Sequence, residues 1–267
     1  MDIPLEARIG LSTLCLKGIP LNEAIERVRD AGFTAFELTP ITYGGPEVFD
    51  DRVCDDLRRR FEAFATTTVH SSGLGNICST DAEQRSRARE GYYGLLRVAK
   101  GTGAGALTLH PGGGGLKGVS DEENVAFGKT LVEAAADSGI RLGYELFDHR
   151  IAEDIGDPHF GVLFDIGHAS RRGPEVSTED VMRMMDELSD QTVQYHIHGV
   201  GEPDKTDHLP FSENTWLDYA PIVRKIEAYD FQGPVILEIG IRDENWQRNL
   251  DDCVLAKEAL LSYASMS

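Results

Sequence analysis

The chain has 267 residues, a length that suits one large domain with a full hydrophobic core and no need for disulfides or a structural metal. Its formal net charge of −19 argues against nucleic acid as a partner, because a polyanion would be repelled over much of the surface. No stretch approaches the roughly 20 apolar residues of a membrane span, and the first residues do not resemble a signal peptide, so we expect a cytoplasmic protein without a membrane partner.

Short β-rich apolar runs alternate with helix-like stretches along the whole chain. The runs are 7–16, 34–38, 66–70, 106–110, 140–146, 160–165, 192–198 and 234–239. Helical patterns occupy 21–32, 50–64, 81–103, 121–139, 177–190, 217–231 and 243–264, and one short helix near 150–156 fits between the fifth and sixth runs. Strands that alternate with helices are typical of parallel βαβ units. Eight such units without a linker predict an α/β fold, namely a single-domain (β/α)8 TIM barrel over residues 1–267.

Seven of the runs carry an ionisable residue at or near their C-terminal end. These residues are Glu37, His70, His110, Glu145, Asp165, His196 and Glu238. In a barrel these ends converge on the face where the active site is built. A single strand-end carboxylate is also consistent with a loop-anchoring ion pair. Four such residues on four successive strands, without matching Lys or Arg, instead predict a metal site formed by Glu145, Asp165, His196 and Glu238, because a shared cation offsets the cost of burying them.

Three carboxylates and one imidazole suit a single divalent cation. Manganese is the first expectation, with magnesium, cobalt or zinc as alternatives. Two vicinal oxygens of a sugar can chelate such a cation, which acidifies the neighbouring C–H and stabilises the developing enediolate. Glu145 and Glu238 would then act as the acid/base pair that moves the proton.

Five segments carry a resemblance to a known family. They are YEL (144–146), LFDIGHA (163–169), YHIHG (195–199), TDHLP (206–210) and GPVILEI (233–239). At these segments, and over nearly its whole length, the sequence resembles the xylose isomerase-like barrel superfamily, in the sugar phosphate isomerase/epimerase branch that shares its fold with endonuclease IV. The resemblance implies the same four metal ligands and the same catalytic pair, Glu145 and Glu238. It also implies that His168 reaches a substrate oxygen, while His70, His110 and His208 line the pocket.

Two further residues are candidates for substrate contact. Glu37 ends the second predicted strand, and Trp216 follows the loop after the seventh. The Trp216 ring would stack on a sugar face, or else fill the core or an interface. The loops depart from the family pattern, with Gly199 where an acidic residue is expected and Ser212-Glu213-Asn214 where a glycine-rich turn is expected.

The leading hypothesis is a metal-dependent isomerase or epimerase acting on a small sugar, a sugar phosphate or a keto-polyol. One alternative is a lyase or dehydratase of the same branch, similar to inosose dehydratase. A second alternative is an abasic-site nuclease of the endonuclease IV type, which needs three metals and a D-x-H pair, whereas Asp207 and His208 are adjacent here. A monomer and a homo-oligomer both stay open.

Overall fold

The structure is a computed structural model in which the eight predicted strands are present. It describes residues 3–71, 74, 77, 79–110, 121–145, 150–171, 175–201, 206–229, 231–241 and 245–265. The strands are β1 (Ile9–Ser12), β2 (Ala35–Leu38), β3 (Thr66–Ser71), β4 (Ala106–Leu109), β5 (Arg141–Tyr144), β6 (Phe160–Asp165), β7 (Thr192–Ile197) and β10 (Val235–Leu237). They form a closed barrel in the order β1-β10-β7-β6-β5-β4-β3-β2. The predicted α/β barrel fold is therefore confirmed, while a single domain over residues 1–267 stays a prediction.

A two-stranded antiparallel hairpin follows β7 and was not predicted. It consists of β8 (Gly199–Gly201) and β9 (Thr206–Leu209). Its segments GVG and TDHL contain glycines and polar residues and form no β-rich apolar run, which is the pattern that predicted the barrel strands. The hairpin matters for the site because β9 carries Asp207 and His208.

Each predicted helical stretch contains an α-helix. The α-helices are α1 (Leu5–Arg8), α2 (Leu21–Asp30), α3 (Asp51–Phe61), α4 (Ala82–Thr102), α5 (Asp121–Ala135), α6 (Arg150–Ile155), α7 (Ile166–Ser170), α8 (Thr178–Leu188), α9 (Tyr219–Ala228) and α10 (Trp246–Ser265). Short 3-10 turns lie at η1 (Thr13–Leu16), η2 (Pro40–Tyr43), η3 (Pro46–Val48), η4 (Ser189–Gln191) and η5 (Phe211–Glu213). Side chains of Asp50, Asp81, Ser177 and Asp218 cap α3, α4, α8 and α9. Among the described helices, none is long and apolar enough to cross a bilayer.

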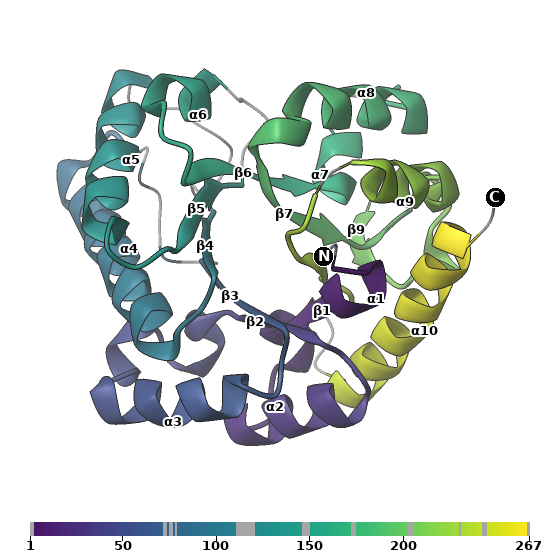
Figure 1. The fold of residues 1–267 in the computed structure, drawn as a ribbon, viewed down its shortest axis with the longest axis horizontal. Coiled ribbons are helices and arrows are strands. Elements are labelled where there is room, and N and C mark those ends of the chain that lie inside the picture. The colour runs from purple at the N-terminus through teal and green to yellow at the C-terminus, as the bar shows by residue number, and fades with distance from the viewer. Residues whose placement is uncertain are drawn as a thin grey trace. The chain divides into compact units, whose positions relative to one another are not determined.

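The chain consists of two compact units. The first comprises residues 1–36, 164–190 and 194–267, and the second comprises residues 37–163 and 191–193. In the first unit β10 pairs in parallel with β1 on one side and with β7 on the other. Helix α10 packs on α9, and its Lys257 donates a hydrogen bond of 2.5 Å to the carbonyl of Gly32, just after the end of α2. Figure 1 shows α10, in yellow, with one end near α2 and the other near α9.

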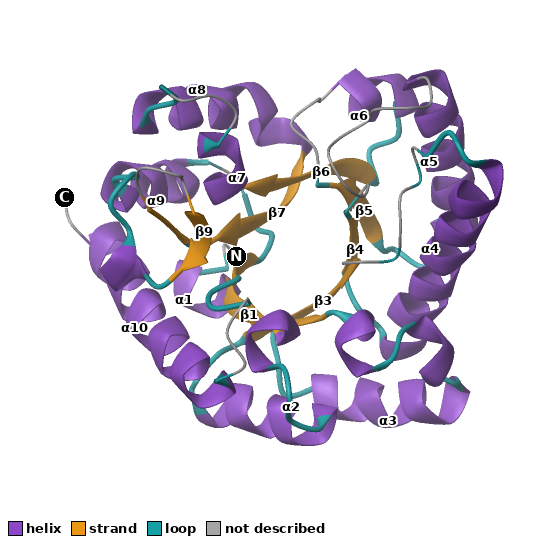
Figure 2. Ribbon diagram, turned by 180° about the vertical axis from the view of Figure 1, so that it is seen from behind, coloured by secondary structure: helices purple, strands orange, loops and turns teal. Residues whose placement is uncertain are grey.

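In the second unit β3, β4, β5 and β6 pair in parallel in that order. Helix α3 packs against α4, and α5 packs against α6. Figure 2 shows α3 and α4 outside the strands β3 and β4. The parallel registers bring the C-terminal ends of neighbouring strands together, which is where the candidate site residues of this unit lie.

Candidate metal centre and active site

Acidic and imidazole side chains gather at the C-terminal ends of β6, β7 and β10. Asp165 is the last residue of β6, His196 lies near the end of β7, and Glu238 directly follows β10. Asp165 and His196 are fully buried and Glu238 is 3% exposed. One ligand atom from each of the three lies within 4.8 Å of the other two. Two carboxylates and an imidazole that converge in a buried site form a donor set that a divalent cation satisfies, so these residues fit the predicted metal.

The turn after β6 aims the carboxylate of Asp165. Its Oδ1 accepts a hydrogen bond of 2.7 Å from the backbone N–H of His168 and caps the short helix α7. Burial acts to raise the pKa of Asp165, but the imidazoles of His168, His198 and His196 hold that pKa well below its usual value. Asp165 is therefore a carboxylate at neutral pH, which is the form that binds a cation.

His198, which was not predicted as a site residue, forms a hydrogen bond with Asp165. Its Nδ1 accepts a hydrogen bond of 2.9 Å from the backbone N–H of His208. Because Nδ1 is an acceptor, the ring proton lies on Nε2, which donates to Asp165 Oδ1 at 3.1 Å. Both ring nitrogens of His198 are thus used within the protein, so this residue orients Asp165 and does not itself offer a lone pair to a metal.

His208 has an uncommon backbone conformation. Its φ of 58° is the only positive φ of a non-glycine residue in the part of the chain that the structure describes. Its carbonyl accepts a hydrogen bond of 2.7 Å from the N–H of Gly240, and its Nδ1 lies 2.9 Å from the carbonyl oxygen of Glu238. Burial, and then the nearby His198, lowers the pKa of His208 to about 3. The ring is therefore neutral at pH 7, with its proton on Nδ1 and a lone pair on Nε2.

His168 bridges two carboxylates. Its Nδ1 lies 3.2 Å from Oδ2 of Asp165, and its Nε2 lies 3.5 Å from Oδ2 of Asp207. Arg171 forms an ion pair with the same oxygen of Asp207. The rings of His168 and His208 meet edge to face with 5.2 Å between their centroids. Two of the histidines predicted to bind substrate thus lie side by side near Asp165.

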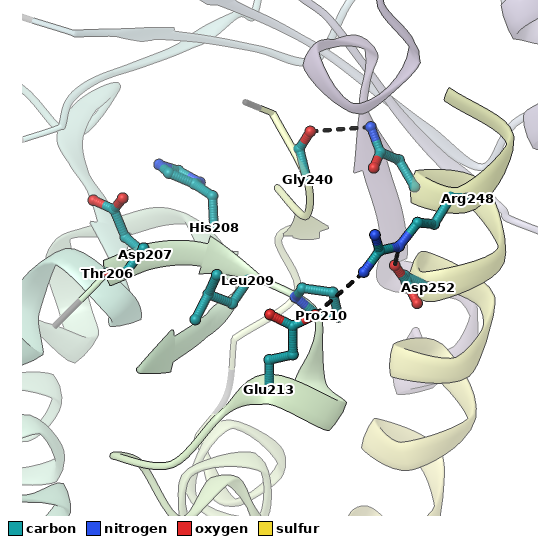
Figure 3. A pocket seen from close by; sticks show the side chains of 10 residues that line it. Thr206, Asp207, His208, Leu209, Pro210, Glu213, Gly240, Arg248 and Asp252 are labelled. Atoms are coloured by element: carbon teal, nitrogen blue, oxygen red, sulfur yellow. Dashed lines mark hydrogen bonds and ion pairs between the residues drawn. The ribbon is translucent and has the colours of Figure 1, made fainter. Parts of the chain in front are cut away.

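A cavity of about 590 Å³ lies between β9 and α10 (Figure 3). Asp207 and His208 line it from β9, and Arg248 and Asp252 line it from α10. Arg248 forms ion pairs with Glu213 at 3.2 Å and with Asp252 at 3.7 Å. The volume falls within the range of small-molecule sites, roughly 300–1,000 Å³. Its lining combines carboxylates, a guanidinium and a neutral imidazole, which are hydrogen-bond partners for the hydroxyl groups of a polar ligand.

The second unit places two further predicted residues together. Glu145 directly follows β5 and is 8% exposed. Its Oε2 lies 3.5 Å from Nε2 of His70, whose Nδ1 lies 2.9 Å from the hydroxyl of Thr108 on the neighbouring strand. Glu145 is thereby held near the ends of β3 and β4. Its role as the fourth metal ligand stays a prediction.

Glu37 and His110 also belong to the second unit. Glu37 is fully buried on β2, and the hydroxyl of Thr68 donates to its Oε2 at 3.4 Å. His110 is half-buried; its backbone N–H donates to the hydroxyl of Ser71 at 2.5 Å, and its carbonyl accepts from the hydroxyl of Tyr92. Contact of Glu37 and His110 with substrate stays a prediction.

Trp216 is half-buried, and its indole N–H donates a hydrogen bond of 2.8 Å to the carbonyl of Val176. This bond holds the segment after the hairpin to the segment before α8. Stacking of the ring on a sugar stays a prediction.

Sequence reasoning missed His198 and Gln194. Gln194 lies on the same face of β7 as His196, because side chains two residues apart in a strand point to the same side, and His198 directly follows β7. Gln194 is fully buried, with Nε2 of its side chain 2.7 Å from Nε2 of His196. The period of two around His196 was a signal that would have found both residues.

The model of the xylose isomerase-like TIM barrel family matches residues 25–257. The chain belongs to this family. An uncharacterised protein of Methanocaldococcus jannaschii, MJ1311, is 22% identical over 97% of this chain and 90% of its own length. A probable endonuclease 4 of Thermoplasma acidophilum is 24% identical over 60% of each chain.

Solved structures share the fold of this family member. A D-tagatose 3-epimerase-like protein superposes with a TM-score of 0.75, at 20% identity over 96% of each chain. The IOLI protein, solved with a bound zinc atom, superposes with a TM-score of 0.73, at 16% identity over 97% of this chain and 98% of its own.

Proposed function

We propose that this protein is a divalent-metal-dependent isomerase or epimerase of a small sugar, a sugar phosphate or a keto-polyol. The observation that carries the proposal is the buried convergence of Asp165, His196 and Glu238 at three strand ends. Glu145 completes the set as the fourth ligand. Manganese is the first candidate, because a site rich in carboxylates favours a hard or borderline cation. The epimerase-like structural neighbour and the zinc atom bound to IOLI support this assignment.

A bound cation would polarise two neighbouring oxygens of the substrate and acidify the C–H between them. The chain's own residues then handle the proton and the hydroxyl groups. Glu238 takes the proton from one face of the substrate carbon, and Glu145 exchanges a proton on the other. His208 accepts a hydrogen bond from a substrate hydroxyl at Nε2, because Nδ1 donates to the carbonyl of Glu238. His168 contacts a second substrate oxygen.

Metal content and proton exchange test the proposal. The purified protein should hold about one divalent ion per chain. A panel of keto-sugars should include one whose C–H proton exchanges with deuterated water in the presence of Mn²⁺ and not after chelation. Glu238→Gln should abolish this exchange, since an amide cannot take the proton. Glu258→Gln, an exposed position on α10, is the matched control and should leave exchange unchanged. Exchange that survives in Glu238→Gln would show that the base is assigned wrongly.

Experiments on the same purified protein distinguish the proposed isomerase from two other enzymes. A dehydratase would release water and give an unsaturated or deoxygenated product from the same substrate. A nuclease would hold three metals and cleave an oligonucleotide with an abasic site; the Thermoplasma relative is named a probable endonuclease 4. The net charge of −19 disfavours this second reaction, because DNA would be repelled. Efficient cleavage of that oligonucleotide would overturn the isomerase proposal.

A further inference from the structure

Gln194 contacts the imidazole of the proposed ligand His196 from within β7. Both side chains are fully buried. Nε2 of Gln194 lies 2.7 Å from Nε2 of His196. A buried amide is costly unless its polar atoms are satisfied, so a glutamine at this position needs a role that a leucine of similar size would not fill.

The contact determines which ring nitrogen of His196 carries the proton. The amide nitrogen of Gln194 can only donate a hydrogen bond, so the Nε2 atom it contacts must accept. In a neutral ring the proton then lies on Nδ1. This nitrogen faces the carboxylates, 3.3 Å from Oε2 of Glu238 and 4.0 Å from Oδ2 of Asp165. In this arrangement the hydrogen on Nδ1 faces the carboxylates, and Nδ1 has no lone pair for a cation.

A cation held by Asp165, Glu238 and His196 needs the opposite arrangement. Nδ1 is the ring nitrogen on the side of the carboxylates, so it must supply the lone pair. The ring proton then lies on Nε2 and requires an acceptor. The amide of Gln194 can provide one by turning over about its last torsion, because its oxygen and nitrogen have nearly the same shape and exchange places.

We propose that Gln194 is a positioning residue that matches the tautomer of His196 to the state of the metal centre. Without a cation its amide N–H donates to Nε2 of His196; with a cation its carbonyl oxygen accepts the proton that Nε2 then carries. This inference rests on the proposed metal centre. A partner on the second ring nitrogen is what orients a histidine ligand and raises its basicity, and loss of such partners typically weakens metal binding about 10–100-fold.

The first test measures the tautomer in the wild-type protein and uses one variant to assign the signals. Nitrogen-detected NMR of the imidazoles, with the His196 signals identified by their loss in His196→Gln, reports the tautomer of His196 without metal and after addition of Zn²⁺. We expect the proton on Nδ1 in the metal-free protein and on Nε2 in the zinc form. A proton on Nε2 in both states would overturn the inference, since Gln194 would then not change roles.

The second test compares three variants by calorimetric titration with Zn²⁺. Gln194→Leu offers neither donor nor acceptor and should bind zinc about 10–100-fold more weakly than the wild type. Gln194→Glu can accept from Nε2 and should bind at least tenfold more tightly than Gln194→Leu. Gln247→Leu, the same change at an exposed position of α10, should bind like the wild type.

The outcomes separate the two proposals. A wild-type protein that binds no divalent cation would overturn the metal centre, and this inference with it. Wild-type binding that is unchanged in Gln194→Leu would overturn only the role of Gln194. If Gln194→Leu does not fold, the tautomers of His196 in the wild-type protein, without metal and with Zn²⁺, still decide.

Discussion

The imidazole of His198 lies so close to Gly167 that no side chain fits between them. A β-carbon built on Gly167 would lie less than 3.0 Å from Cε1 of His198, closer than such atoms approach in real structures. Gly167 is the second residue of α7, the short helix that directly follows the ligand candidate Asp165. The glycine therefore makes room for the ring that orients the carboxylate.

Gly167→Ala should displace His198 and weaken its hydrogen bond to Asp165. Overpacking of this kind costs about 1–3 kcal/mol of stability, measured by urea denaturation. Gly105→Ala, where a β-carbon meets only ordinary contacts, is the control and should change stability by less than about 0.5 kcal/mol. In a double-mutant cycle the cost of Gly167→Ala should largely vanish when His198→Ala is already present. If Gly167→Ala still costs the full amount of stability in the His198→Ala background, the clash does not involve His198.

The backbone at His208 should prefer glycine to alanine. A left-handed conformation such as its φ of 58° costs an alanine roughly 1–2 kcal/mol, and costs a glycine little. His208→Ala and His208→Gly both lose the ring and its hydrogen bonds, so the difference between them isolates the backbone. We expect His208→Gly to be more stable by about 1 kcal/mol in urea denaturation. Equal stability would mean that the chain relaxes out of this conformation once the ring is gone.

Divalent metal should stabilise the fold if the proposed centre binds it. Binding to the folded state adds about 2.7 kcal/mol when the free metal is at 100 times its dissociation constant. The midpoint temperature of thermal unfolding should therefore rise by several degrees with Mn²⁺ and fall back after a chelator removes the metal. His196→Gln should lose most of the shift. His159→Gln, the same change at an exposed histidine, should keep it, and a loss in both would indicate a nonspecific effect.

The buried amide of Asn249 should not tolerate replacement by a carboxylate. Its Nδ2 donates to the carbonyls of Cys15 and Gly240, each at 3.0 Å, and so ties α10 to the segment after Glu238. Asn249→Asp keeps the shape but sets an acceptor against two acceptors, at a cost of about 1–3 kcal/mol or more.

The pH dependence of this cost has a definite sign. Burial raises the pKa of the new carboxyl above its unfolded value of about 3.9. The stability that Asn249→Asp loses relative to the wild type should therefore be largest at neutral pH. This loss should shrink as the pH falls, because the protonated acid can donate one of the two hydrogen bonds. Asn22→Asp at the exposed start of α2 should be nearly neutral at both pH values.

Much of the fold was predictable because local patterns and tertiary structure agree. The eight apolar runs became the barrel strands, and the ends of α3 and α4 follow from Asp50, Asp81 and Gly103, which cap them. The hairpin of β8 and β9 was missed because its strands contain Gly199, Gly201 and polar residues and so form no apolar run. It brings His208 to Glu238, across 30 positions of sequence, by a hydrogen bond that no local pattern encodes.

The sequence by itself determined the barrel and the positions of the acidic and imidazole residues at the strand ends. The period of the strands dictates which residues share a face, and parallel topology brings their ends together. Only the tertiary structure decided how these residues act on one another: which ring nitrogen of His198 and His208 carries the proton, why residue 167 must be glycine, and that Gln194 contacts His196. These properties depend on distances of about 3 Å between atoms of different elements, within the range where hydrogen bonds form, and a sequence pattern does not encode such distances.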